Sequence, residues 1–238
     1  SAPWLAHNKD NAVWGAADNE YGGLSAYWNA HTFGQFIPSG KYFEEHPEYF
    51  SVRNGERIPY GQLCLTNPDV LKLCTEGVMN AIEKNPLYWV YSVSQNDNMF
   101  PCECEHCKAM EEKYGGHSGL LIWFVNQVAD AVKTVYPDKY IGTFAYQYTR
   151  QIPKNIVPRE NVVIRLCNIE CDFSHPIVET DYNKSFLEDL KQWSAVAPHL
   201  FIWDYVVNFN QYLAPYPNFQ TLAPNIRLFK KYKAIGIQ

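Results

Sequence analysis

The chain has 238 residues, a formal net charge of −5 and aromatic side chains at 16% of its positions. This length is sufficient for one large α/β domain or two small ones with a buried core. The acidic balance disfavours a nucleic-acid-binding surface, because such a surface needs clustered Lys and Arg. No run of about 18 apolar residues occurs, so the sequence predicts no membrane-spanning helix.

The aromatic content favours a neutral or weakly charged ligand such as a sugar. The 7 Trp and 17 Tyr exceed what a core of this size needs. Flat rings suit the apolar faces of pyranoses, although each ring can equally pack in the core. The chain reads as a single domain, 1–238, from the interior of a larger protein, because both ends resemble mid-protein sequence.

The first 20 residues show no clear period. Residues 24–30 then predict a short strand whose end carries Trp28 and His31. A histidine at this position can bind substrate or move a proton, or can simply bond to the backbone. Asn54-Gly55 predicts a tight hairpin, because this pair supplies positive φ angles. Asn67 and Pro68 predict the N-cap and first position of a helix.

The stretch 88–107 combines a buried strand with a polar end. Its first half is aromatic and β-branched, which predicts a strand at about 88–94. Gln95, Asn96 and Asp97 follow where the strand ends, at the position where parallel α/β enzymes place their chemistry. Asp97 is therefore the leading candidate for a working acid, although an Asp here can also cap the next turn.

Three cysteines follow at once. Cys102, Cys104 and Cys107 lie within six residues and can bind one structural zinc if a fourth ligand comes from elsewhere. Candidates for that ligand are His106, His117 and Cys171. A disulfide or unliganded thiols in a small turn are the alternatives, and the odd total of seven cysteines disfavours a pure disulfide framework.

The rest of the chain alternates between helices and strands. Helices are predicted from Ser118 to Pro137, at 183–195 and at 222–232, and strands at 139–146, 161–167, 200–205 and 234–238. Together with the two earlier strands this makes about six, with most polar side chains after strand ends. The pattern predicts an α/β fold of the TIM-type (β/α)₈ class, incomplete in this chain. No glycine-rich nucleotide motif follows any strand.

Three carboxylates follow predicted strands: Asp97, Glu170 and Asp204. Glycoside hydrolysis needs a protonated acid beside the leaving oxygen, and a second carboxylate or a substrate group on the other face. Glu170 can alternatively form a salt bridge, with Arg165 as one partner. Asp204, between two aromatic residues, can bind sugar hydroxyls as readily as take part in catalysis.

Several sequence blocks occur in a fixed order: HTF, KYFEEHPEYF, QLCLTNP, SVSQNDN, CECEHC, NVVIRLCNIECDFSHP, WDYVVNF and PYPN. Together they resemble the bacterial carbohydrate-active family known as domain of unknown function 4838. That family is related to glycoside hydrolase family 163, endo-β-N-acetylglucosaminidases acting on complex N-glycans. The resemblance spans roughly residue 24 to the end of the chain.

The resemblance implies a TIM-like barrel, a retaining, acetamido-assisted mechanism, and an extracytoplasmic setting in the periplasm or at the cell surface. Asn96-Asp97 is similar to the adjacent pair of substrate-assisted hexosaminidases. Asn96 would then orient the sugar acetamido group and Asp97 would protonate the leaving group. Because hexosaminidases more often use Glu as the acid, Glu170 is the substitute.

We therefore predict a glycoside hydrolase that cleaves a β-linked N-acetylglucosamine unit in an oligosaccharide or glycoprotein glycan and needs no cofactor for catalysis. The residues predicted to line the sugar subsites are Trp28, His31, Gln95, Tyr146, Trp203, Asp204 and Tyr205. Two alternatives remain open. One is a two-carboxylate glycosidase that uses Asp97 and Glu170 on another sugar, such as a uronic acid. The other is a non-catalytic glycan-binding barrel.

Overall fold

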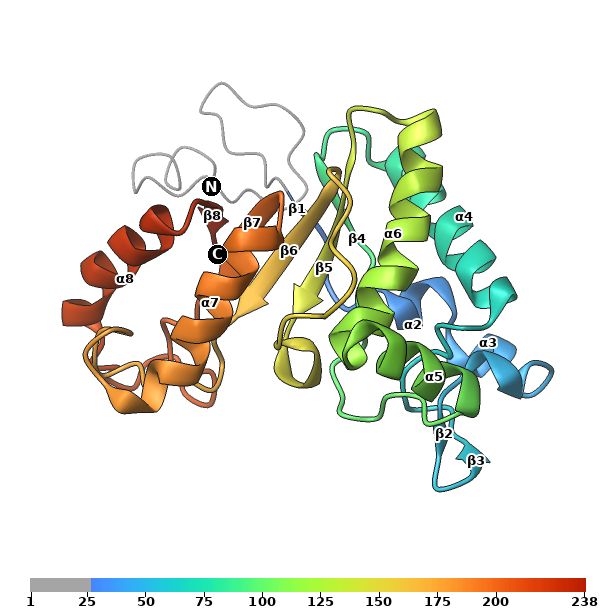
Figure 1. Cartoon of the computed structure of the whole chain (residues 1–238), viewed down its shortest axis with the longest axis horizontal. Helices are drawn as coiled ribbons and strands as arrows, with labels where there is room; N and C mark the ends of the chain where they lie inside the picture. Colours follow the sequence, from blue (N-terminus) through green and yellow to red (C-terminus); the bar gives the residue numbers. More distant parts are fainter. Residues whose placement is uncertain (1–26) are drawn as a thin grey trace. The chain divides into compact units, whose positions relative to one another are not determined.

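A parallel sheet accompanied by helices makes up the computed structural model, which describes residues 27–238 (Figure 1). The strands of this sheet are β1 (Tyr27–Trp28), β4 (Val90–Ser92), β5 (Tyr140–Ala145), β6 (Val162–Cys167), β7 (His199–Trp203) and β8 (Ala234–Ile237). The α-helices are α2 (Phe33–Phe36), α3 (Ser39–Tyr42), α4 (Pro68–Lys84), α5 (Glu105–Tyr114), α6 (His117–Val135), α7 (Lys184–Val196) and α8 (Phe219–Lys231).

The six strands lie in the order β1-β4-β5-β6-β7-β8, which is also their order along the chain. The pairs β1–β4, β4–β5, β6–β7 and β7–β8 are parallel. A (β/α)₈ barrel has this sequential order, whereas a doubly wound sheet reverses its order at a switch point. The prediction of an α/β fold with part of a TIM-type (β/α)₈ barrel is therefore confirmed.

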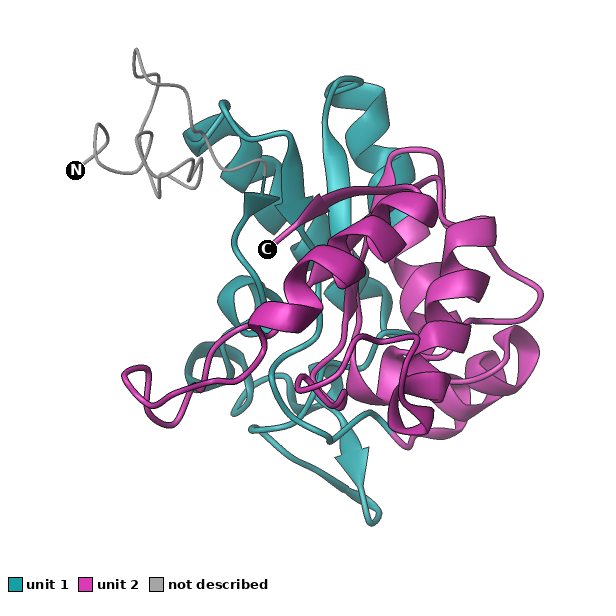
Figure 2. Cartoon of the chain, turned by 90° about the vertical axis from the view of Figure 1, so that its left-hand side faces the viewer, with its two compact units in different colours: residues 1–102, 127–142 teal, residues 103–126, 143–238 magenta. Residues whose placement is uncertain are grey.

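The chain forms two compact units, coloured separately in Figure 2. Unit 1 comprises residues 1–102 and 127–142, and unit 2 comprises residues 103–126 and 143–238. Since the structure describes the chain from Tyr27 onward, the predicted start of the first strand at 24–26 lies outside the described residues.

Local sequence signals explain two elements of unit 1. A small antiparallel hairpin joins β2 (Val52–Arg53) to β3 (Glu56–Arg57), and its turn residues Asn54 and Gly55 have φ angles of 50° and 86°. Helix α4 starts at Pro68, with the side chain of Asn67 accepting from the backbone of Asp69 and Val70. Both predictions are confirmed, because each depends only on neighbouring residues.

In unit 2, the strands β6 and β7 are paired in register from Val163 with His199 to Cys167 with Trp203. Helices α7 and α8 lie beside the strands β6, β7 and β8 (Figure 1). Side chains alternate between the two faces of a strand, so Arg165 and Phe201 share one face while Ile164 and Ile202 share the other. Within residues 27–238, three short 3₁₀ turns also occur: η1 (Pro47–Tyr49), η2 (Gln147–Thr149) and η3 (Asp181–Asn183).

Some elements differ from the sequence prediction. The short helices α2 and α3 and the ten-residue helix α5 were not predicted, and α5 begins within the cysteine-rich stretch, for which a small turn was one of the alternatives. Helix α8 begins at Phe219, three residues before the predicted start, and contains Pro224 within it. Between Tyr27 and the end of the chain, no helix is both long and apolar enough to cross a membrane.

Candidate functional site

Asp204 follows the last residue of β7 and is held by two hydrogen bonds to one of its oxygens. The side-chain amide of Asn168 donates to Oδ1 at 2.7 Å, and the backbone N–H of Tyr205 donates to the same atom at 3.1 Å. Burial raises the pKa of Asp204, and these two bonds oppose that shift only in part. A carboxyl group whose pKa is raised by burial is the usual choice for a general acid.

Asn168 occupies the position after β6, so adjacent strand ends supply the amide and the carboxyl group. The Asn168 side chain is fully buried, and its Oδ1 has no hydrogen-bond partner among the described residues. A buried polar atom without a partner is unfavourable and needs a physical explanation, of which contact with a ligand or a catalytic role is one. The sequence analysis did not single out Asn168, although its position at a strand end gave the same signal as that of Asp204.

Aromatic rings gather around Asp204. Trp203 and Tyr205 are stacked, with ring centroids 6.4 Å apart and an interplanar angle of 23°. Phe173 lies 6.3 Å from Tyr205 and 6.2 Å from Tyr216. These four rings, Trp203, Tyr205, Phe173 and Tyr216, are called the aromatic group below. Such rings offer flat apolar surfaces beside a carboxyl group, which is the combination that sugars bind.

Arg165 supports the aromatic group from within β6. Its guanidinium carbon lies 4.9 Å from the ring centroid of Trp203, 5.3 Å from that of Phe201 and 5.9 Å from that of Phe144. The Arg165 side chain is buried. A buried cation over ring faces fixes the rings through cation–π attraction, so Trp203 is held at the end of β7 in a defined orientation.

The carboxylates of Glu170 and Asp172 affect some of the same neighbouring groups as Asp204 does. Burial raises the pKa of the Cys171 thiol to about 12, with contributions from the charges of Glu170, Asp204 and Asp172. Burial and the charges of Asp204 and Asp172 also raise the pKa of Tyr216. The carboxylates after β6 and β7 therefore lie close enough together to influence shared neighbours.

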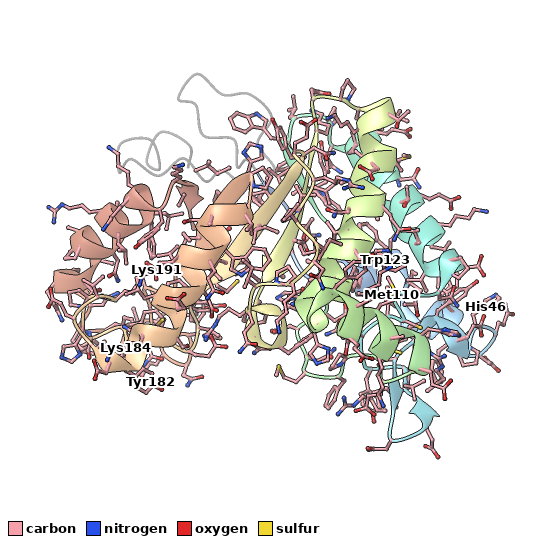
Figure 3. The ribbon with its side chains drawn as sticks, in the orientation of Figure 1. His46, Met110, Trp123, Tyr182, Lys184 and Lys191 are labelled. Atoms are coloured by element: carbon pink, nitrogen blue, oxygen red, sulfur yellow. The ribbon has the colours of Figure 1, made fainter. Side chains whose placement is uncertain are left out.

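Glu170 is half exposed and forms an ion pair with Arg150, whose Nη1 lies 2.9 Å from Glu170 Oε2. Arg150 also binds Asp189 Oδ2 at 2.7 Å and Ser185 Oγ at 2.6 Å. The salt bridge weighed for Glu170 is thus present, with Arg150 as the partner. Glu170, Arg150 and Ser185 border a cavity of about 380 Å³. Tyr182, in the turn before α7, also lines this cavity (Figure 3).

Asn96 lies in unit 1 in the loop after β4, and both ends of its side-chain amide bond to the backbone. The oxygen Oδ1 accepts from the N–H of Gly34 at 2.8 Å, and Nδ2 donates to the carbonyl of Gly61 at 3.1 Å. Gln62 fixes the same loop, because its Nε2 donates to the carbonyl oxygens of Asn96 and Asn98 at 2.8 and 3.0 Å. Asn96 is thus a structural element of this loop.

Asp97, the predicted proton donor, is exposed in the same loop. It lines a cavity of about 390 Å³ within unit 1, together with Gly34, Tyr60 and Asn98. The arrangement of Asp97 suits contact with a ligand from solvent. The Asp97 side chain is more exposed to solvent than that of Asp204.

The other predicted substrate-binding residues lie in different surroundings. In unit 1, Trp28 is stacked with Phe36 at 6.3 Å, and Nδ1 of His31 lies 2.8 Å from the carbonyl oxygen of Gln95. Gln95 is buried. In unit 2, Tyr146 is also buried, at the end of β5. Of the predicted subsite residues, the structure thus brings His31 and Gln95 together in unit 1, whereas Trp203, Asp204 and Tyr205 are consecutive residues at the end of β7 in unit 2.

The predicted metal ligands form part of a larger sulfur cluster. The Sγ atoms of Cys64, Cys102, Cys104 and Cys107 all lie within 4.8 Å of one another. Cys64, and none of the three predicted candidates, is the fourth member of this group among the described residues. Cys64 lies 38 residues before Cys102, so no local spacing pattern in the sequence connects it to the other three cysteines.

The model of the family described as Domain of unknown function (DUF4838) matches residues 3–238. No curated protein matches the sequence. Among solved structures, endo-glycoceramidase II from Rhodococcus sp. in a five-membered iminocyclitol complex matches with a TM-score of 0.44 and 9% identity, over 73% of this chain and 41% of that one. The β-glucuronidase of Parabacteroides merdae matches with a TM-score of 0.37 and 13% identity, over 76% and 22%.

Proposed function

The chain belongs to the DUF4838 family, and from this premise we propose that it is a glycoside hydrolase in which Asp204 is the proton donor. The observation that carries the proposal is a partly buried carboxyl group at a strand end, beside stacked aromatic rings, whose pKa is raised by desolvation. A general acid must hold its proton until the leaving oxygen needs it, and burial supplies that property.

The hydrogen bonds of Asp204 also fix where its proton resides. Oδ1 accepts from Asn168 and from the N–H of Tyr205, so the proton of the neutral form is placed on Oδ2. No hydrogen bond to Oδ2 is found among residues 27–238. An acid held by one oxygen can donate from the other without rotating, which reduces the reorganisation needed in the transition state.

For the substrate, we propose a β-linked N-acetylglucosamine unit in a complex glycan, cleaved with retention outside the cytoplasm. Support for this comes from the resemblance of the sequence blocks to endo-β-N-acetylglucosaminidases of glycoside hydrolase family 163. In the acetamido-assisted scheme the carbonyl oxygen of the substrate attacks the anomeric carbon while the acid protonates the leaving oxygen. Stacking on Trp203 and Tyr205 would position the sugar face.

Asn96 and Asp97 keep a place in this proposal as the alternative pair for orienting the acetamido group and donating the proton. The backbone bonds of Asn96 favour a structural role for its amide. The exposure of Asp97 favours contact with the glycan over proton donation. The two candidate acids are therefore distinguishable by substitution.

A two-carboxylate glycosidase is the second candidate. It is favoured by the position of Glu170 two residues after Asn168, whose side-chain amide donates to Asp204, so that both carboxylates lie beside the ends of β6 and β7. Glu170 would then be the nucleophile and Asp204 the acid, with Arg150 holding Glu170 in position. This scheme does not need an acetamido group on the substrate.

The test is glycan release from a complex-type N-glycoprotein by the full-length protein, measured by mass spectrometry. We expect released glycans that lack one reducing-end N-acetylglucosamine, and inhibition by a thiazoline analogue of that sugar. Activity that resists the thiazoline and is abolished in Glu170→Gln would support the second candidate. Binding of the glycan without any release would contradict both and leave a glycan-binding protein.

A further inference from the structure

The sulfur cluster of Cys64, Cys102, Cys104 and Cys107 lies outside the proposed glycosidase chemistry. All four sulfur atoms lie within 4.8 Å of one another. In a tetrahedral zinc site with bonds of about 2.3 Å, neighbouring sulfur atoms are about 3.8 Å apart. The observed group therefore has the size of a zinc site, with a small contraction on metal binding.

From this geometry we infer that the four cysteines form a structural zinc site. Four thiolates select a soft tetrahedral ion, and four protein ligands leave no open position for a catalytic water. No disulfide joins any of the seven cysteines, all of which lie in the described part of the chain. Cys64, Cys102 and Cys107 are buried and Cys104 is partly exposed, so the ion would be shielded from most of the solvent.

The local backbone supplies two ligands in a suitable arrangement. Cys104 is the N-cap residue of α5, and Cys107 lies in the first turn of that helix. Backbone N–H groups are unpaired at a helix start, and they favour negative charge there. A Cys-x-x-Cys pair at this position therefore presents two thiolates where the helix itself lowers their energy.

Hydrogen-bonding groups also lie close to the sulfur atoms of Cys102 and Cys64. The N–H of Val52 donates to Cys102 Sγ at 3.4 Å, and Nη1 of Arg57 lies 3.9 Å from the same sulfur. Thr66 Oγ1 lies 3.6 Å from Cys64 Sγ. Donors around ligand sulfur are the usual second layer of a metal–thiolate site, and the Arg57 charge would offset part of its negative charge.

The site has a structural consequence for the loop after β4. Cys64 is two residues from Gln62, whose N–H donates to the carbonyl of Phe100 and whose side chain holds Asn96 and Asn98. Cys102 lies in the same loop, three residues before the start of α5. An ion that binds Cys64 and Cys102 would therefore join the segment of Gln62 to the loop that carries Asp97.

The first experiment measures the metal content of the full-length protein, purified without chelators, by inductively coupled plasma mass spectrometry. We expect one zinc ion per chain, released in proportion to thiol modification when the folded protein is titrated with p-mercuribenzoate. Cobalt substitution should give the thiolate charge-transfer and tetrahedral d–d absorption bands. A metal-free protein that takes up no cobalt would overturn the inference, and iron in place of zinc would overturn its choice of ion.

Two variants test the membership of Cys64. Cys64→Ala should lose zinc to a competing chelator at a concentration that leaves the wild type loaded. Cys74→Ala removes an equally buried cysteine on α4 and should keep its zinc. Equal zinc retention in both variants would contradict a role for Cys64. If Cys64→Ala does not fold, the thiol titration of the wild type still decides the outcome, because zinc release must then accompany modification of four thiols.

Discussion

The loop after β4 and the strand ends of β6 and β7 look alike in sequence and differ in structure. Each has amides and a carboxylate directly after a buried strand. In the first region, the Asn96 amide and the Gln62 side chain hold backbone groups of the loop. In the second, the side-chain amide of Asn168 donates to the carboxyl group of Asp204. The other oxygen of Asp204 has no protein partner in the described chain. A polar strand end therefore indicates chemistry only where its polar atoms are not used to hold the fold.

The largest expected effect concerns Asp204. Asp204→Asn should lower glycan release by about 10²- to 10⁴-fold, the usual contribution of a general acid. The loss should be much smaller with an aryl glycoside whose leaving group needs no proton, as rate measurements on both substrates would reveal. The matched control is Asp181→Asn, which removes an exposed carboxylate paired with Lys184. Similar losses on both substrates would argue against proton donation by Asp204.

Asp97 provides the direct contrast. If Asp204 is the acid, Asp97→Asn should lower kcat on the natural glycan by less than about tenfold, because the remaining effect is on binding. Comparing kcat and KM of Asp97→Asn with those of Asp204→Asn shows which of the two regions holds the proton donor. A loss of kcat in Asp97→Asn as large as that expected for Asp204→Asn would reverse the assignment.

The aromatic group should contribute to affinity. Trp203→Ala should weaken glycan binding by about tenfold, since an aromatic contact is worth about 0.5–1.5 kcal/mol beyond its buried area. Isothermal titration with the catalytically impaired Asp204→Asn protein measures this without turnover. Phe219→Ala, which removes a ring that is 84% exposed and outside the aromatic group, should bind normally. Unchanged affinity after loss of Trp203 would exclude stacking on this ring.

Asn96 should affect stability. Asn96→Ala leaves the N–H of Gly34 and the carbonyl of Gly61 without their side-chain partner, at a cost of about 1–3 kcal/mol in unfolding free energy. Urea denaturation measures the loss, with the exposed Asn80→Ala on α4 as control. A fully stable variant that has lost acetamido-substrate selectivity would favour the catalytic role predicted from sequence.

The smallest effect is a pH dependence of stability. The pKa of Asp204 is raised in the folded state, so its contribution is most favourable at pH values below its ordinary pKa of 3.8. That contribution is lost as the pH rises through the raised pKa. Asp204→Asn removes this dependence, so its stability relative to the wild type should increase as the pH rises across that window.

Asp172 should show a pH dependence of stability opposite to that of Asp204, so it is the control for these measurements. Hydrogen bonds from Ser174 and His175 lower its pKa, so it stabilises the fold above the ordinary pKa and loses this contribution as the pH falls. Denaturation of Asp172→Asn over the same pH series should therefore show a deficit at neutral pH that disappears in acid. Parallel curves for the two variants would contradict the assigned directions.

Much of the fold could be predicted because its signals are local. The alternation of apolar strands and amphipathic helices located all six strands, and Asn54-Gly55 and Asn67-Pro68 located a turn and a helix start. Helix α5 was missed because its apolar period is weak, with Cys107 as its one buried residue, and because its cysteines were interpreted as metal ligands without a helix. Part of the candidate site was predicted as well, since Trp203, Asp204 and Tyr205 were expected in a sugar subsite.

The sequence by itself determined the strand order, the polar strand ends and the family to which the chain belongs, because each depends on residues close together in the chain or on the order of whole blocks. The tertiary structure alone decided how those polar residues are used. Burial distinguishes Asp204 from Asp97, backbone groups of Gly34 and Gly61 engage Asn96, and Cys64 joins cysteines far along the chain. Desolvation and hydrogen-bond partners arise from contacts between distant segments, which a linear pattern does not specify.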